Sequence, residues 1–351
     1  MSEAEEDILF DVVGKAGVVT LNRPKALNAL THDMIRRLRS ALDTWRDAEE
    51  VKSVIVRTHE DAKAFCSGGD IRHACSAGQS DDPRLLEFFA DEYRLNSVIK
   101  HYPKPYVSLI DGIVMGGGVG ISVHGSHRIG GEKLLFSMPE VSIGFFPDVG
   151  GTYFLPRLPH KVGIYCAVTG GRMKLEDAVW SGVITHPVPS ERFDDVFSAL
   201  TQTDDPDTVL NEFTFEPGHA PLADHAHFIE AVFARETVAA IRQGLAEAAG
   251  ADQDWAKKTL SFLERGSPTS VEIALRQMQR GATLDFVDCM RLEFRIVSQI
   301  LKGHDFYEGV RAVLIDRDNA PKWKPDGHDL VTSLAIENHF IAPPGGDLVL
   351  D

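Results

Sequence analysis

Two carboxylates lie eight positions apart in MPEVSIGFFPDVGG, residues 138–151, a stretch that is otherwise apolar and rich in glycine. A charge among apolar neighbours is costly unless it is paired or its pKa shifts. Two interpretations of Glu140 and Asp148 are therefore open from this stretch alone. Either they are held in a salt bridge or a helix cap, or they form an acid/base pair that lines a pocket.

Two glycine-rich loops are suited to exposing backbone N–H groups. MGGGVG (115–120) ends an expected strand and precedes an expected helix, and FCSGGD (65–70) follows another strand, with Asp70 placed to cap a following helix. Neither a dinucleotide fingerprint nor a Walker A loop fits the first stretch, so its N–H groups suit a phosphate or a developing oxyanion. The alternative is that the glycines only permit tight packing. If both loops follow neighbouring parallel strands, their N–H groups converge at one sheet edge, and with Glu140 and Asp148 they predict carbonyl or thioester chemistry without a metal.

Other catalytic arrangements have less support in the sequence. His124 and His127 form H-x-x-H without an adjacent Glu or a third ligand at a usual spacing, which is more typical of ordinary loop histidines. No G-x-S-x-G elbow is present for serine chemistry. The four cysteines show no CxxC spacing and are interpreted as reduced thiols, without a disulfide framework or a zinc site: Cys66, Cys75, Cys166 and Cys289.

The elements that must position these residues alternate between strands and helices. ILFDVV and GVVTLN predict a β-hairpin, and THDMIRRLRSALDTWRD (31–47) and residues 84–101 predict amphipathic helices. The alternation predicts an α/β domain with parallel strands over residues 1–205. The acidic, turn-forming stretch 201–208 predicts a boundary, followed by a helical region at 206–330 that covers the active site. Residues 331–351 are expected to form a loosely tied tail.

The overall composition excludes several classes of function. The chain has 351 residues, 43% of them hydrophobic, and a net charge of −16 from 36 basic and 52 acidic residues. This balance argues against a general nucleic-acid binder but allows a local site for a phosphorylated small ligand. No run of 18 apolar residues is present, so no membrane span is expected. The acidic start, MSEAEEDILF, resembles neither a signal nor a transit peptide, and a cytoplasmic location is expected.

Longer motifs resemble the crotonase superfamily of acyl-coenzyme A enzymes. KAFCSGGDI, KPYVSLIDGIVMGGGVGIS and FSMPEVSIGFFPDVGGTYFLPRL match in order and spacing, as do YCAVTGGRMKLEDAVWSGVITH and GHDFYEGVRAVLIDRDNAPKWKP. The resemblance extends from VVTLNRPKALNAL to PKWKP, nearly the whole chain. It implies a spiral core of repeated β-β-α units with a C-terminal helical region. It also implies an acyl-CoA substrate, no cofactor beyond that coenzyme A, and a homo-oligomer whose form is left open.

The resemblance assigns roles residue by residue. Gly69 and Gly117 match the two oxyanion-hole donors, Glu140 the catalytic glutamate and Asp148 its acidic partner. Glu92 matches a substrate-contacting glutamate, although Asp91 and Arg94 beside it also allow a solvated helix face. Lys63, Phe65 and Asp70 complete the expected substrate-binding set. Four basic residues lie near the loops that the superfamily uses for the nucleotide portion, or are solvated surface charges: Arg23, Lys25, Lys63 and Arg72.

The position of the first hydratase glutamate decides between two branches of the superfamily. Hydratases carry that glutamate just after the triple glycine, where this chain has Gly120, and they usually have glycine where it has Asp148. The likeness is therefore strongest to the hydrolases of 3-hydroxyisobutyryl-coenzyme A, which implies hydrolysis of a short branched 3-hydroxyacyl thioester in valine catabolism. The alternatives are an enoyl-CoA hydratase or isomerase and a non-catalytic acyl-CoA binding protein.

Overall fold

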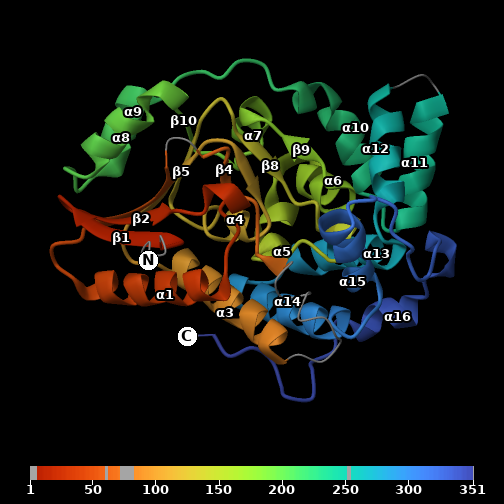
Figure 1. Ribbon diagram of the computed structural model, residues 1–351. Coiled ribbons are helices and arrows are strands. Elements are labelled where there is room, and N and C mark those ends of the chain that lie inside the picture. The colour runs from red at the N-terminus through yellow and green to blue at the C-terminus, as the bar shows by residue number, and fades with distance from the viewer. Residues whose placement is uncertain (1–5, 60–61, 72–82, 251–253, 351) are drawn as a thin grey trace.

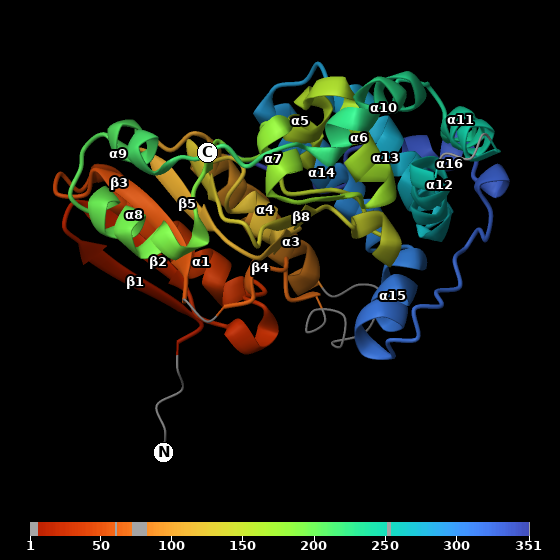
Figure 2. The ribbon, with the colours of Figure 1, turned by 90° about the horizontal axis from the view of Figure 1, so that it is seen from above.

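The larger of two sheets has six strands and lies at one end of the molecule (Figures 1 and 2). The structure is a computed structural model that describes residues 6–59, 62–71, 83–250 and 254–350. β1 and β2 form the expected antiparallel hairpin, and the remaining strands are parallel to β2. In spatial order the strands are β1 (Ile8–Val13), β2 (Ala16–Leu21), β3 (Ser53–Thr58), β5 (Tyr106–Ile110), β7 (His127–Gly130) and β10 (His186–Pro187).

The smaller sheet carries both glycine loops. Its spatial order is β4 (Ala64–Cys66), β6 (Ile113–Met115), β8 (Leu135–Ser137) and β9 (Arg172–Met173), with only β9 antiparallel. In each of the pairs β3–β4, β5–β6 and β7–β8, the first strand belongs to the larger sheet and the second to the smaller sheet. The expected spiral of β-β-α units is therefore confirmed. Because β4 and β6 are parallel neighbours, the loops that follow them meet at one edge, as predicted.

The apolar run from KPYVSLIDG into IVMGGG is divided between the two sheets. The chain bends at Gly112, so that β5 before it and β6 after it belong to different sheets. Gly112 has φ +91°, and a Cβ there would lie 2.5 Å from the carbonyl oxygen of Lys63. Only glycine combines this backbone conformation with such a close approach.

The helices of the first part of the chain cover both sheets. The prediction for 31–47 is confirmed by α1 (His32–Asp47), where the Thr31 hydroxyl accepts the Met34 N–H at 3.2 Å as an N-cap. The helix buries one apolar stripe, from Met34 through Leu38 to Trp45. The other helices here are α3 (Pro83–Lys100), α4 (Gly117–Gly120), α5 (Gly151–Phe154), α6 (Val162–Thr169), α7 (Leu175–Trp180), α8 (Phe193–Leu200) and α9 (Pro206–Phe213).

The C-terminal part is helical, as predicted from about residue 225. Figure 1 shows these helices at the end of the molecule away from β1 and β2. No helix among the described residues is long and apolar enough to cross a membrane. The helices are α10 (Ala226–Phe233), α11 (Val238–Gly250), α12 (Asp254–Arg265), α13 (Pro268–Gly281), α14 (Phe286–Ile300), α15 (Asp305–Val310), the π-helix Arg311–Ile315 and α16 (Ser333–Asn338).

The larger of two hydrophobic clusters joins the C-terminal helices to the smaller sheet. In it the ring of Phe145 lies 5.1 Å from the ring of Phe306 of α15, at an interplanar angle of 44°, and α13 and α14 pack against α5, α6 and α3. A second cluster lies between the larger sheet and the α8–α9 pair (Figure 2), so α9, which begins beyond the predicted boundary at 205, also packs on the sheet.

The last residues are packed rather than loosely tied. Phe340 and Leu348 are buried, and the Arg295 guanidinium donates to both carboxylate oxygens of Asp347 at 2.6 Å. The polar composition of APPGGD gave no sign of these contacts, which come from side chains on α14 and α3.

Candidate active site

A cavity of about 100 Å³ lies where the two glycine loops meet α3 and the stretch 138–151. Five residues singled out from the sequence line it together: Gly69, Glu92, Gly117, Glu140 and Asp148. Its apolar wall is formed by Ile71, Phe88, Phe89, Met115, Ile143 and Phe145.

The two predicted N–H donors lie next to each other. A Cβ added to Gly117 would lie 3.2 Å from the Gly69 nitrogen. Leu30 bonds to both neighbours of Gly69, since Leu30 N–H donates to Gly68 and Asp70 N–H donates to Leu30, each at 2.8 Å. Within the described residues neither the Gly69 nor the Gly117 N–H has a protein acceptor. The pair is therefore available to a carbonyl oxygen from a ligand.

The two carboxylates face this cavity and form no ion pair with a described residue, so the salt-bridge interpretation is wrong. Glu140 begins a 3-10 turn (Glu140–Ile143), and its buried Oε2 has no hydrogen-bond partner among the described residues. Asp148 Oδ2 accepts the Tyr93 hydroxyl at 2.9 Å. Burial among apolar walls without a counter-charge sets both groups up to hold protons near neutral pH.

The pKa shifts have a common physical cause. Burial, and then the charge of Asp148, raise the pKa of Glu140 well above its ordinary value. Burial raises the pKa of Asp148 to about 7, while the hydrogen bond from Tyr93 opposes this rise. Carboxyl groups whose pKa values are raised in this way can exchange protons with a bound substrate near neutral pH.

Glu92 belongs to the site and not to a solvated helix face. Its side chain is 2% exposed, and Oε1 would lie 2.4 Å from a Cβ on Gly117. Burial, with the charges of Asp148 and Glu293, raises its pKa well above the ordinary value. The preceding residue, Asp91, points outward and pairs with His32, Arg36 and Arg94.

Some predicted binding residues are not at the cavity. Phe65 is fully buried in the core, and Lys63 and Lys25 are exposed away from the lining. Asp70 pairs with Arg23 at 3.1 Å, so both side chains are used in fastening the glycine loop. Arg72 and Cys75 lie outside the described residues, as does any helix that Asp70 would cap.

The position of the missing hydratase glutamate is physically closed. A Cβ on Gly120 would lie 2.7 Å from Val149 Cβ and 2.8 Å from Asn96 Nδ2. Val149 and Asn96 are both buried, so neither has open space to move into. A glutamate at this position would displace the segment that holds Asp148.

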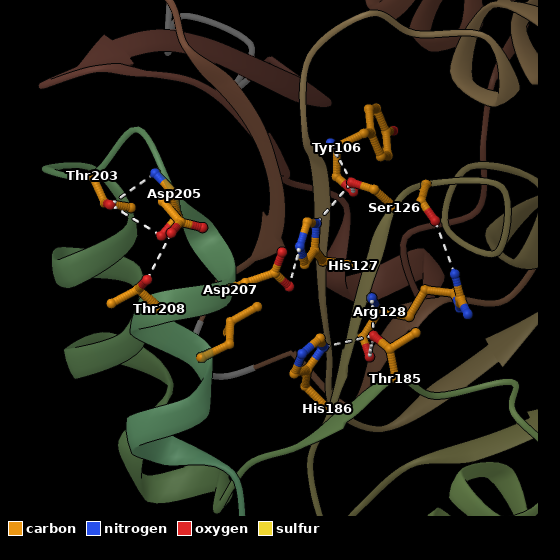
Figure 3. A network of polar contacts seen from close by, with 12 residues as sticks. Tyr106, Ser126, His127, Arg128, Thr185, His186, Thr203, Asp205, Asp207 and Thr208 are labelled. Carbon is orange, nitrogen blue, oxygen red and sulfur yellow. Dashed lines mark hydrogen bonds and ion pairs between the residues drawn. The ribbon is translucent and has the colours of Figure 1, made fainter.

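The rejected arrangements have structural roles. His124 donates to the Val149 carbonyl at 2.7 Å, and burial lowers its pKa to about 3. His127 lies between Ser126 and Asp207, away from the cavity (Figure 3). The described residues contain no cluster of three metal-ligating side chains. Burial raises the pKa of Cys66 to about 12, so its thiol is not a nucleophile.

Sequence reasoning missed Tyr93, Gln277 and Glu293. Glu293 is fully buried on α14 and accepts the N–H groups of Gly150 and Thr152, both at 2.9 Å. One signal was present, because Glu293 interrupts the apolar stripe of its helix between Met290 and Ile296. Its partners are too distant in sequence for any local pattern to reveal them.

Comparison with known proteins agrees with this geometry. A profile of the enoyl-CoA hydratase/isomerase family matches residues 16–340. The chain belongs to this family, which is the crotonase superfamily that the sequence resembles.

Individual relatives fall into two groups by name. The chain is 43% identical to the mitochondrial 3-hydroxyisobutyryl-CoA hydrolase of Danio rerio, over 99% of the chain and 93% of the relative. It is 41% identical to the human protein of that name, over 99% and 92%. A solved structure titled carnitinyl-CoA dehydratase, from Mycobacterium thermoresistibile, superposes with a TM-score of 0.93 at 38% identity, covering 99% of both chains. An enoyl-CoA hydratase from Rhodobacter sphaeroides gives 0.91 at 35% identity, covering 98% of this chain and all of the other.

Proposed function

We propose that the protein hydrolyses the thioester of a short branched 3-hydroxyacyl-CoA, with 3-hydroxyisobutyryl-CoA as substrate and 3-hydroxyisobutyrate and coenzyme A as products. The observation that carries the proposal is that the Gly69 and Gly117 N–H groups, which have no acceptor among the described residues, lie around one cavity with buried Glu140 and Asp148. The near-full-length curated relatives named for this hydrolase support the substrate.

The N–H pair acts on the thioester carbonyl. Its oxygen accepts hydrogen bonds from Gly69 and Gly117, which stabilise the negative charge of the tetrahedral state. Each such donor typically lowers the activation barrier by about 3–4 kcal/mol. The donors belong to the backbone of two packed loops, so little reorganisation is needed when the charge develops.

The two carboxyl groups provide or activate the attacking oxygen and transfer the protons of the reaction. Glu140, in its ionised form, attacks the carbonyl carbon, or it takes a proton from a water that attacks. The carbon–sulfur bond then breaks and the coenzyme A thiolate receives a proton. Direct attack by Glu140 leaves a mixed anhydride on its side chain, which a water hydrolyses to 3-hydroxyisobutyrate and the restored carboxylate, whereas attack by the water gives the acid in one step. Asp148, with a pKa raised to about 7, orients the water or substrate hydroxyl, or donates that proton. The Tyr93 hydroxyl holds one oxygen of Asp148 during these steps.

A second candidate is hydration of an enoyl-CoA, which the names of the two superposed structures favour. Hydration requires one group to activate water and another to deliver a proton to carbon. Here the glutamate that hydratases carry just after the triple glycine is replaced by Gly120, whose surroundings leave no room for a side chain. We therefore place hydrolysis first.

The remaining expectations accompany this proposal. We propose that coenzyme A enters as part of the substrate and that no further cofactor takes part. A homo-oligomer and a cytoplasmic location stay predictions, and the curated relatives are named as mitochondrial proteins.

The deciding experiment is release of free thiol from 3-hydroxyisobutyryl-CoA, run beside hydration of crotonyl-CoA. We expect thiol release by the wild-type protein and its near-complete loss in Glu140→Ala. Glu247→Ala, at an exposed position on α11, is the matched control and should keep the wild-type rate. Hydration of crotonyl-CoA without thiol release would refute the hydrolase assignment in favour of the second candidate.

A further inference from the structure

The segment that carries Asp148 has no regular structure of its own. It runs from Pro147 to the start of α5 and includes two consecutive residues with positive φ, Val149 at +51° and Gly150 at +84°. Positive φ is unfavourable for a β-branched residue such as valine. Such a conformation persists only where the surrounding structure holds it.

Side chains from the C-terminal helices hold this segment on both sides of Asp148. Glu293 of α14 accepts Gly150 N–H through Oε2 and Thr152 N–H through Oε1, both at 2.9 Å. Gln277 of α13 donates to the Pro147 carbonyl and to the Thr152 hydroxyl, both at 2.6 Å. Both helix side chains are fully buried, so water cannot take over these hydrogen bonds.

We propose that Glu293 is a positioning residue for Asp148. It accepts hydrogen bonds from the two N–H groups that follow Asp148 in the chain, and so keeps the Asp148 carboxylate at the cavity. The inference rests on the proposed function only in taking Asp148 as part of the reaction. A carboxylate is suited to this task because each of its oxygens accepts one N–H, whereas an amide has only one acceptor oxygen.

Glu293 also interacts electrostatically with Asp148. The charges of Asp148, Glu92 and Glu293 act on one another and on the Tyr93 hydroxyl, and the Cys289 thiol on α14 feels the charge of Glu293. Neutral His124 bonds to the Val149 carbonyl of the segment that carries Asp148.

No described cation neutralises this cluster. Lys100 and Arg157 lie over the ring of Tyr153 and form no ion pair with Glu293. Burial and the charge of Asp148 raise the pKa of Glu293 to about 8, against the two N–H hydrogen bonds. Burial thus raises the pKa of both carboxyl groups, and a charge on Asp148 opposes the ionisation of Glu293.

The test is a double-mutant cycle with Glu293→Gln and Asp148→Asn, measured as kcat and KM for thiol release. Gln keeps the size of the side chain but has one acceptor oxygen, so we expect kcat to fall about 10- to 100-fold, as for a small misplacement of a reacting group. KM should change less than threefold, because the change does not touch the nucleotide end of the substrate. In the Asp148→Asn background the same substitution should change kcat less than twofold.

Two further readouts separate positioning from simple support of the fold. The pH dependence of kcat above pH 7 should show one ionisation fewer in Glu293→Gln than in the wild type. Ser298→Ala is the control: the Ser298 hydroxyl is buried on α14 and donates to the Phe294 carbonyl of its own helix, so this change should leave kcat and its pH dependence unchanged. If Glu293→Gln does not fold, Glu293→Asp keeps the carboxyl group but is too short to reach both N–H groups, and the same cycle applies.

Equal losses of kcat in the two backgrounds, or a loss of stability with unchanged kcat, would overturn the positioning role. Failure of the proposed function is a separate result, since it shows as absence of thiol release by the wild type. The cycle is then measured on crotonyl-CoA hydration, because the hydrogen bonds by which Glu293 positions Asp148 do not depend on the substrate.

Discussion

The oxyanion hole is tested most directly by adding one methyl group to Gly117. A Cβ at this position would lie 2.4 Å from Glu92 Oε1, 3.2 Å from the Gly69 nitrogen and 3.2 Å from Leu30 Cδ1. The backbone of Gly117 is not in the positive-φ region, so alanine causes no backbone strain. The effect of Gly117→Ala therefore comes from the space that the methyl group occupies.

That space is where the carbonyl oxygen of the substrate must lie. With the methyl group 3.2 Å from the Gly69 nitrogen, an oxygen cannot approach both N–H groups at hydrogen-bonding distance. Loss of one oxyanion donor lowers kcat by about 10²–10³, equivalent to about 2.7–4 kcal/mol. The methyl group also pushes aside the Glu92 carboxylate, so we expect the upper part of this range.

The assay is kcat for thiol release from 3-hydroxyisobutyryl-CoA, with thermal unfolding of the same samples. Gly327→Ala is the matched control, because a Cβ there meets nothing within 4 Å, and both kcat and Tm should stay at wild-type values. Gly117→Ala should remain folded, since the closest atom is the end of a side chain. A Gly117→Ala protein that kept more than half of the wild-type kcat would show that these N–H groups do not bind the reacting oxygen.

Two further predictions concern the surroundings of the carboxylates. Gly120→Glu should not create a hydratase, because its Cβ would lie 2.7 Å from Val149 Cβ. This crowding should lower the free energy of unfolding by about 1–3 kcal/mol. A gain of crotonyl-CoA hydration would contradict this reasoning. Asp148 and Glu293 have folded pKa values of about 7 and 8, above their unfolded values, so the stability they contribute at low pH is lost as pH rises. Each lowers the unfolding free energy by about 1.4 kcal/mol per pH unit between its two pKa values. The unfolding free energy measured with denaturant at pH 5.5 and 6.5 should therefore fall less steeply with pH, by that amount, in Glu293→Gln than in the wild type. An unchanged slope would show that folding does not raise the pKa of Glu293.

The convergence of the two glycine loops was predictable from local rules. Apolar runs with helices between them indicate parallel strands, and neighbouring parallel strands end at the same edge of a sheet. The two glycine loops could therefore be expected together if their strands are neighbours, and the resemblance supplied Gly69 and Gly117 as the donors. The cost of placing charges in an apolar stretch drew attention to Glu140 and Asp148 but left both a salt bridge or cap and an acid/base pair open.

The division of strands between the two sheets was not predictable in the same way. Residues 104–116 are continuously apolar enough to read as one strand, and the bend depends on Gly112 approaching the Lys63 carbonyl. That contact joins segments about fifty residues apart, and single-sequence periodicity carries no information about it. Phe65, expected at the substrate, is instead fully buried in the core; all three residues of β4 are buried, so the strand has no alternation that would show which side chain faces the cavity.

The contacts that hold Asp148 in place are the part of the site that local sequence patterns could predict least. Glu293 is 143 residues from Gly150, and Gln277 is 130 residues from Pro147. A segment with positive φ at Val149 and Gly150 cannot hold its own conformation, so Asp148 reaches its position only when α13 and α14 have packed. The C-terminal helices are therefore more than a cover over a finished site, since the polar groups on two of them complete it. The isolated stretch 138–151 contains both acids, but the geometry that makes them a pair is supplied by the far end of the chain.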